Sequence, residues 1–291
     1  MLPAIRLLML ALALRAAFGQ DFSGIQVVKV SANHRFTEGP AWSQEGYLLF
    51  SDVPGNRILK FTPGEGVSTA RENANGASGN AFDSQGRLYT CETRTRRVIR
   101  MDKRGRVEVL ADKWEGKRLN APNDIVVRRD GQVYFTDPAF GAQSDARELD
   151  FYGVYHITPK GELSVIAKPK GRPNGVALSA HGRVLYVTNS DDRTVSAYDL
   201  DRQGAASNER VLIGDIPGVP GGLRLDEKGN LYVASQGVCV YSPAGKRIAF
   251  IEMQDAASNL AFGDEDLQSL YITARTSVYR VRLDVKGAVQ H

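Results

Sequence analysis

The stretch EGPAWSQEGYLLFSD at residues 38–52 decides the fold, because the chain repeats its pattern. A polar or small residue leads a short apolar run, a turn ends in Gly, and a second apolar run follows. Further copies are SGNAFDSQGRLYTCE at 78–92, NDIVVRRDGQVYFTD at 123–137, NGVALSAHGRVLYVTN at 174–189 and GGLRLDEKGNLYVAS at 221–235. A looser copy, SNLAFGDEDLQSLYIT at 258–273, is placed by its apolar run alone.

Copies that begin about 40 to 50 residues apart, each with several short strands, are typical of a β-propeller. In the second copy, apolar alternation predicts four strands near residues 81–82, 87–90, 97–101 and 107–110. We therefore predict an all-β fold, a six-bladed β-propeller of four-stranded blades. The expected blades cover residues 36–72, 76–116, 118–169, 171–216, 218–255 and 257–286.

Two segments outside the repeated pattern have expected roles. Residues 22–32, which contain IQVVKV, are expected to add a strand to the last blade and close the ring, removing an exposed sheet edge. The insertion at residues 139–152 in the third copy is expected to form a loop over one mouth of the channel and to shape a substrate pocket.

The first nineteen residues, MLPAIRLLMLALALRAAFG, predict a secretory signal peptide. They combine an early Arg, an apolar run and small residues before a cleavage point after Gly19. The alternative, an uncleaved membrane anchor, needs about 20 apolar residues and is disfavoured, so stable membrane insertion is not expected. We expect an exported protein, periplasmic or extracellular, in which residues 20–291 form a single propeller domain.

Charge and cysteine content exclude several classes of function. The formal net charge is +4, and no basic run is long enough to predict nucleic-acid binding. The group RTRR at 94–97 is expected to be a solvated turn. Cys91 and Cys239 fall in the second and fifth copies, on opposite sides of a six-fold ring. They are therefore too far apart for a disulfide, and two free, buried thiols are predicted.

The first residue of each copy is expected to face the central channel. These residues are Glu38, Ser78, Asn123, Asn174, Gly221 and Ser258. Carboxylate and amide oxygens at the same position of three copies predict a site for a hard divalent cation such as calcium. None of these six positions holds His or Cys, which disfavours zinc or copper. The alternative for each Asn is a side chain that bonds its own turn. Asp124 is expected to point away from the channel by strand alternation.

Six phrases together resemble a known protein family. They are FTEGPAW (36–42), GKRLNAPNDIVV (116–127), YFTDPAFG (134–141), RPNGVALS (172–179), GNLYVAS (229–235) and SNLAFG (258–263). The chain resembles the family of senescence marker protein (regucalcin), gluconolactonase and luciferin-regenerating enzyme, and is most similar to its bacterial gluconolactonase branch. The resemblance covers essentially the whole mature chain.

The resemblance implies a six-bladed propeller that holds one divalent metal ion, usually calcium, and hydrolyses sugar lactones or related esters. By position, Glu38 and Asn174 match metal ligands of the family. Asn123 matches a residue that contacts substrate and sometimes the metal through water. The family's fifth blade carries a Pro-Asp-Gly phrase whose Asp is a metal ligand and the proposed general base, whereas this chain has Gly221 there.

Without that Asp, the sequence does not identify which residue acts as the general base. Asp226 aligns with a turn and Asp215 precedes the motif, so neither is expected to replace it. Asp137, Glu92 and Asp191 lie near the expected channel mouth, although a turn cap is the favoured interpretation of each. With one anionic ligand left, metal binding is expected to be weak, towards about the millimolar range.

Three hypotheses follow from the sequence. The first is an exported metal-dependent lactonase in which Glu38 and Asn174 hold the metal and Asn123 orients the lactone. The second is a catalytically impaired propeller that binds a sugar-like ligand or a partner. The third is a scaffolding propeller with an unused channel, since one fold hosts many functions.

Overall fold

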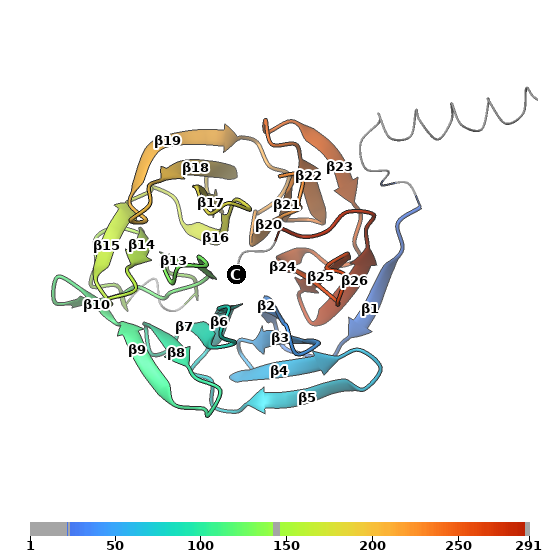
Figure 1. Ribbon diagram of the computed structural model, residues 1–291, viewed down its shortest axis with the longest axis horizontal. Coiled ribbons are helices and arrows are strands. Elements are labelled where there is room, and N and C mark those ends of the chain that lie inside the picture. The colour runs from blue at the N-terminus through green and yellow to red at the C-terminus, as the bar shows by residue number, and fades with distance from the viewer. Residues whose placement is uncertain (1–21, 23, 142–145, 289–291) are drawn as a thin grey trace, which may run out of the picture.

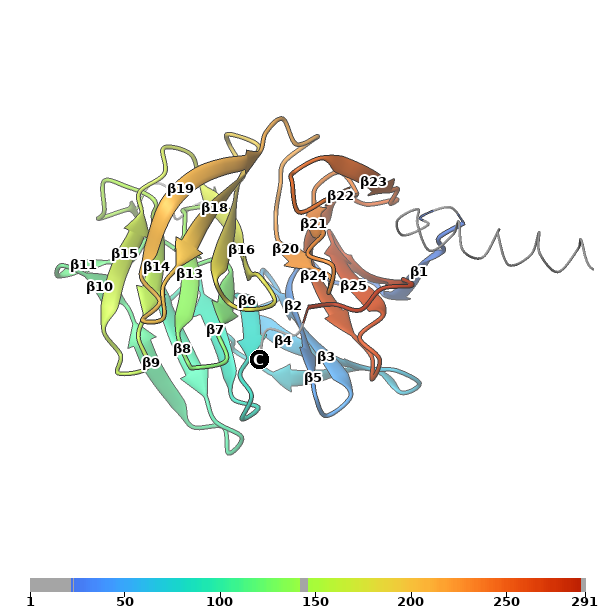
Figure 2. The same ribbon diagram turned by 45° about the horizontal axis from the view of Figure 1, so that its top comes forward.

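The computed structural model describes residue 22, residues 24–141 and residues 146–288. It is an all-β ring of six antiparallel four-stranded sheets around a central channel (Figure 1), so the predicted six-bladed propeller is confirmed. Figure 2 shows the same ring tilted, with the blades standing around the channel. The expected signal peptide lies outside the described residues. No helix in the described ranges is long and apolar enough to cross a membrane.

The first three blades follow one another along the chain from the inside of the ring outward. Blade 1 has β2 (Thr37–Ser43), β3 (Tyr47–Asp52), β4 (Arg57–Thr62) and β5 (Gly66–Arg71). Blade 2 has β6 (Ala77–Phe82), β7 (Leu88–Glu92), β8 (Arg97–Met101) and β9 (Val107–Ala111). Blade 3 has β12 (Ile125–Val127), β13 (Val133–Asp137), β14 (Gly153–Ile157) and β15 (Leu163–Ala167).

The remaining blades repeat this order, and the last one closes the ring. Blade 4 has β16 (Pro173–Leu178), β17 (Val184–Asn189), β18 (Thr194–Leu200) and β19 (Ala206–Ile213). Blade 5 has β20 (Leu223–Leu225), β21 (Leu231–Ala234), β22 (Val238–Tyr241) and β23 (Arg247–Ile251). Blade 6 has β24 (Ala257–Gly263), β25 (Ser269–Ala274) and β26 (Ser277–Arg282), and β1 (Val27–Ser31) pairs with β26 as its fourth strand. The predicted closure by the N-terminal segment is therefore confirmed.

The hydrophobic core lies between the blades rather than on the axis. Six clusters of buried apolar residues are present in the described part of the chain, and each joins two neighbouring blades. Aromatic contacts bridge the same seams: Trp42 of blade 1 stacks on Tyr271 of blade 6 at 5.4 Å between ring centroids. Because the seams take most of the apolar side chains, the layer of the channel at the first residue of each repeat is left largely to polar groups.

The inner strand of every blade carries a β-bulge near the first residue of its repeat. The register between inner and second strands shifts there in blades 1, 2, 4 and 6. In blade 3, Thr136 accepts from Asn123 N–H and donates to the Asp124 carbonyl, so two inner residues oppose one. Gly221 and Gly222 oppose a single residue of β21 in blade 5 in the same way. Such bulges re-aim side chains that regular alternation would place on opposite faces.

The turn at 94–97 is not fully solvated, which corrects one expectation. Arg96 is buried, and its guanidinium donates to the carbonyls of Leu119 (2.6 Å) and Ala146 (3.0 Å). It thereby ties blade 2 to a short hairpin, β10 (Lys113–Trp114) and β11 (Lys117–Arg118), and to the insertion of blade 3. Cys91 and Cys239 are free and buried, as predicted.

Candidate metal and lactone site

The first residue of each repeat lies on the inner strand or directly before it, around the central channel (Figure 1). Their main chains are joined in a circuit that links every neighbouring pair of blades. The bonds are Ser51 Oγ to Ser78 O (2.8 Å), Gly79 N to Asn123 O (2.7 Å), Thr136 Oγ1 to Asn174 O (2.5 Å), Thr188 Oγ1 to Gly221 O (2.6 Å), Gly222 N to Ser258 O (2.8 Å) and Ser258 Oγ to Thr37 O (2.7 Å). Because these carbonyls accept from a neighbouring blade, side-chain oxygens are the groups left for a ligand.

Glu38 is the carboxylate of this layer. It is buried, and its Oε2 accepts hydrogen bonds from Gly39 N (2.7 Å) and Asn259 Nδ2 (3.0 Å). Burial, followed by the negative charge of Asp124, raises the pKa of Glu38 to about 7. A nearby cation would favour the charged carboxylate and offset this desolvation.

Asn123 and Asn174 each present an amide oxygen that has no partner among the described residues. Asn123 Nδ2 lies 3.5 Å from Ser78 Oγ, and Asn174 Nδ2 donates to Ser190 Oγ at 3.0 Å. Both Oδ1 atoms are buried and unpaired. An unpaired buried acceptor costs about 1–3 kcal/mol, so two such atoms on one layer call for a ligand that supplies positive charge. The amides therefore do not simply bond their own turns.

These residues fit a hard divalent cation. Calcium prefers carboxylate and amide oxygens, and the set contains one carboxylate with two amide oxygens. No group of three or more His, Cys, Asp or Glu side chains that could hold a metal ion occurs within the described ranges. A cation on this layer would thus depend on amide oxygens and water for most of its ligands. Ser78 and Ser258 use their hydroxyls within the protein.

The backbone at Gly221 is closed in by blade 6. A Cβ at this position would lie 2.1 Å from the Ser258 carbonyl oxygen, and one at Gly222 would lie 1.7 Å from Asn259 Oδ1. The Ser258 carbonyl that faces Gly221 belongs to the main chain and cannot yield to such a contact as the end of a flexible side chain can. The fifth blade therefore lacks both the family Asp and the space for a side chain there.

The other acidic residues considered from the sequence have structural partners. Asp137 accepts from the backbone N–H groups of Asn120 and Ala121, both at 2.8 Å, and burial raises its pKa to about 7. Glu92 is bonded by Arg71 (2.7 Å), Arg97 (2.6 Å), Asn75 and Thr95. Asp191 forms an exposed pair with Arg172 at 2.6 Å.

Two further acidic residues behave as expected from the sequence. Asp226 caps its turn by accepting from Lys228 N (2.9 Å) and Asn230 N (2.8 Å). Asp215 is fully exposed beside Arg193. Neither residue occupies the place of the missing fifth-blade Asp.

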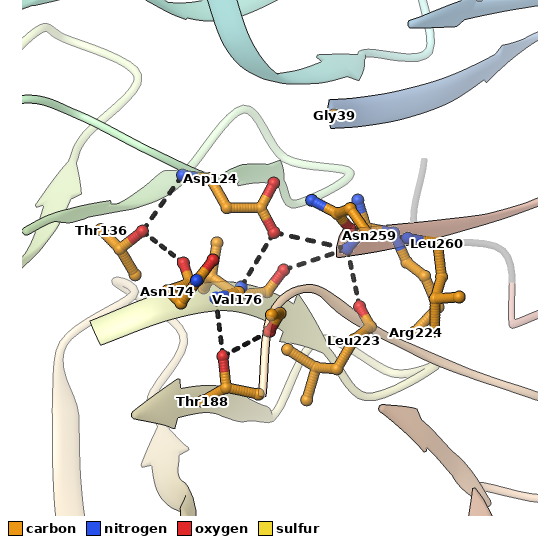
Figure 3. A network of polar contacts seen from close by, with 12 residues as sticks. Gly39, Asp124, Thr136, Asn174, Val176, Thr188, Leu223, Arg224, Asn259 and Leu260 are labelled. Atoms are coloured by element: carbon orange, nitrogen blue, oxygen red, sulfur yellow. Dashed lines mark hydrogen bonds and ion pairs between the residues drawn. The ribbon is translucent and has the colours of Figure 1, made fainter. Parts of the chain in front are cut away.

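Asp124 lies inside the ring, so the expectation that it points away from the channel was wrong. Its side chain is fully buried, and Oδ2 accepts from Val176 N of blade 4 at 3.1 Å and lies 3.7 Å from Arg224 Nη1 of blade 5 (Figure 3). A Cβ on Gly79 of blade 2 would meet its Oδ1 at 2.7 Å. The bulge at Asn123 is the physical reason, since it interrupts the alternation on which the expectation depended.

The sequence held a signal for this inner layer. The second residue of the copies is Gly39, Gly79, Asp124, Gly175, Gly222 and Asn259, so the two polar exceptions stand in a column of glycines. The fourth residue is Ala41, Ala81, Val126, Ala177, Arg224 and Ala261, so a lone Arg stands in a small apolar column. Figure 3 shows Asp124, Arg224 and Asn259 together.

A six-bladed propeller with oxygen donors on one layer of its channel defines a class of proteins rather than one activity. Residues 36–276 match the family described as SMP-30/Gluconolactonase/LRE-like region, and the chain belongs to this family. The resemblance seen in the sequence is thereby confirmed.

Named relatives agree with this assignment. A gluconolactonase of Zymomonas mobilis is 32% identical over 290 residues, covering 89% of this chain and 81% of the relative. The solved structure of a gluconolactonase from Xanthomonas campestris is 32% identical with a TM-score of 0.84, covering 92% of each chain. A regucalcin from Agrobacterium tumefaciens, described as a calcium-binding protein, shares the fold with a TM-score of 0.76 at 18% identity, covering 90% of this chain and 96% of that one.

Proposed function

We propose that this protein is a metal-dependent hydrolase of sugar lactones or related esters, with calcium as its cation. The proposal rests chiefly on the two unpaired amide oxygens of Asn123 and Asn174, which share one layer of the repeat with the Glu38 carboxylate. Two gluconolactonases at 32% identity support the choice of substrate class.

Glu38 and Asn174 would hold the cation, with Asn123 completing the set and orienting the lactone ring. A divalent cation supplies Lewis-acid polarisation of an ester carbonyl when it is bound. Hydrolysis adds water across the ring ester: the acyl carbon–oxygen bond breaks, the acyl carbon gains hydroxyl, and the released ring oxygen gains a proton. The protein's part is to place the ester against this layer, and the anchored amides of Asn123 and Asn174 provide fixed positions for it.

The negative charge around the cation differs from that of the family pattern. Gly221 brings no carboxylate, whereas buried Asp124 has an Oδ1 without a partner among the described residues and lies close enough to influence the pKa of Glu38. Asp124 therefore adds a buried carboxylate from blade 3 to the inner ring, where Arg224 lies 3.7 Å from it, and Glu38 stays the one carboxylate among the proposed ligands.

The experiment is calorimetric titration with calcium, manganese and zinc, together with hydrolysis of gluconolactone and other lactones. We expect cation binding in the range of about 10⁻⁴ to 10⁻³ M and metal-stimulated turnover. Glu38→Gln should weaken binding by about tenfold or more, while Glu72→Gln, at an exposed site, should leave it unchanged. Absence of metal-stimulated turnover on every lactone would contradict the enzyme proposal.

Gly221 favours one second candidate, a catalytically impaired propeller that binds a sugar-like ligand. In that case calorimetry would detect binding of the cation and of the hydroxy acid that lactone hydrolysis produces, while lactone turnover would stay at the uncatalysed rate. We also propose that the chain is exported, to the periplasm or beyond the cell. Cell fractionation, with the N-terminal residue of the mature protein determined, tests this separately.

A further inference from the structure

A cavity lies at the end of the channel opposite the layer of Glu38, Asn123 and Asn174. It has a volume of about 340 Å³, and inner-strand residues of blades 1, 2, 3, 5 and 6 line it. These lining residues follow the first residue of each copy by two to four positions, which at about 3.3 Å per residue places the cavity roughly 7–13 Å along the strands. This volume lies within the range of sites for small ligands.

The wall of this cavity is largely apolar. Trp42 and Phe262 contribute aromatic surface, and Ala81, Ile125 and Leu225 contribute aliphatic surface. The backbone of the C-terminal segment completes the wall, because Gly287 N donates to Leu267 O and Ala288 N donates to Leu225 O, both at 2.9 Å. The cavity is therefore a formed pocket, not a gap between loops.

The positively charged guanidinium of Arg224 lies at the inner end of this apolar wall. Arg224 lines the cavity, and its side chain is only 12% exposed. The guanidinium donates to Leu223 O (2.6 Å) and Val176 O (3.4 Å) and lies 3.7 Å from Asp124, and each of these contacts uses Nη1 (Figure 3). The hydrogen bonds of Arg224 within the described ranges thus leave Nε and Nη2 available to a ligand in the cavity.

Apart from Asp124, which pairs with Arg224, the acidic residues that line the cavity are Asp264 and Glu265, and neither opposes an anion at its inner end. Asp264 accepts from Tyr271 at 2.6 Å and pairs with Arg280 and Arg282, so its charge is compensated. Glu265 is exposed at the rim, where water and salt screen it. At the inner end, the charge of Arg224 is partly offset by Asp124 at 3.7 Å, and apolar surface dominates along the wall.

We propose that this cavity binds a small apolar carboxylate, whose carboxylate group meets Arg224 and whose hydrocarbon part lies against Trp42 and Phe262. A guanidinium offers paired donors that match a carboxylate, and burial strengthens such charge-assisted bonds. The site uses neither the proposed metal ion nor its ligands Glu38, Asn123 and Asn174, although Arg224 and Asp124 lie close enough to Glu38 to act on its charge.

Benzoate is the probe, added to chelator-treated protein and followed by calorimetry and by the fluorescence of Trp42. We expect one benzoate per chain, with benzyl alcohol binding about tenfold or more weakly because it lacks the charge. Arg224→Met should weaken benzoate by at least about tenfold, and Arg224→Lys should weaken it less. Trp42→Phe should remove the fluorescence change while retaining binding.

Arg224→Met also leaves Asp124 without its counter-ion, so a second variant keeps the test independent of that pair. Ala81→Phe fills the cavity and leaves Arg224 and Asp124 in place. It should abolish benzoate binding while calcium binding at the other end of the channel is unchanged. The proposal is overturned if benzoate does not bind the wild type, if benzyl alcohol binds equally well, or if Ala81→Phe binds benzoate as the wild type does.

Discussion

Asn123 and Asn174 destabilise the propeller when no ligand is bound in its channel. Each has a buried amide oxygen without a partner in the described structure, while Asn80, on the neighbouring inner strand, has its amide fully engaged. Unpaired acceptors are destabilising unless a ligand satisfies them. The contrast between these asparagines separates residues that build the ring from residues that serve a ligand.

Asn174→Ala should therefore reduce function without reducing the stability of the metal-free protein. We expect the unfolding free energy without calcium to change by less than about 1 kcal/mol, because the lost bond to Ser190 is offset by removal of an unpaired oxygen. Stabilisation by added calcium should be lost. Thermal unfolding with and without calcium measures both effects. Asn80→Ala is the control and should destabilise the protein under both conditions by about 2 kcal/mol or more.

Asp137 predicts a dependence of stability on pH. Burial raises its pKa to about 7, well above the value of the unfolded chain, so the folded protein binds a proton that the unfolded chain releases. Its contribution to stability is therefore fully present below about pH 4 and is lost as the pH rises through about 7. Urea unfolding at several pH values should show wild-type stability falling relative to Asp137→Asn across this window. A constant difference between the two proteins would contradict the prediction.

Gly221→Asp, which restores the family residue, should destabilise the protein. A Cβ there would lie 2.1 Å from the Ser258 carbonyl oxygen, so blades 5 and 6 must separate to admit it. We expect a loss of about 2 kcal/mol or more in unfolding free energy. Gly214→Asp is the matched control, because a Cβ at Gly214 meets nothing within 4 Å. Unchanged stability of Gly221→Asp would show that the inner strand adjusts easily.

At the scale of the element, the inner-strand bulge determines which side chains enter the channel. Strand periodicity correctly predicted that the first residue of each copy lies by the axis, but it misplaced Asp124. A bulge sets two residues against one, so neighbouring residues no longer point to opposite faces. The sequence shows the repeat but not the hydrogen bonds that displace the register.

Arg96 and Asn120 are buried side chains that hold the insertion of blade 3, and Asn120 donates to Phe151 O at 2.9 Å. Arg96 donates to Leu119 O and Ala146 O, so Arg96→Ala leaves two carbonyls without a donor. We expect a loss of about 2 kcal/mol in unfolding free energy and faster limited proteolysis within residues 146–152. Arg94→Ala, at an exposed neighbour whose side chain donates to Pro54 O, should change neither quantity appreciably.

At the scale of the whole molecule, stability depends on closing the ring. β1 pairs with β26 and places Val27 against the cluster shared by blades 5 and 6, while Val28 is 52% exposed. Val27→Asp should therefore lower the melting temperature by several degrees, because it places a charge in that partly buried apolar seam. Val28→Asp, one residue away on the other face of the strand, should change it little. Equal effects of the two substitutions would contradict the closure.

The repeated phrase by itself determined the number of blades, their approximate limits and the presence of oxygen donors at three positions, and the apolar N-terminal segment outside it predicted the closure of the ring. Local periodicity and spacing carry this information, since a strand and its turn form from neighbours in sequence. Only the tertiary structure decided that Asn123 and Asn174 keep unpaired oxygens, that Asp124 turns inward, that Gly221 has no room for a side chain, and that Arg224 ends an apolar cavity. Each of these depends on contacts between different blades, and sequence spacing does not record how closely two blades approach at the axis.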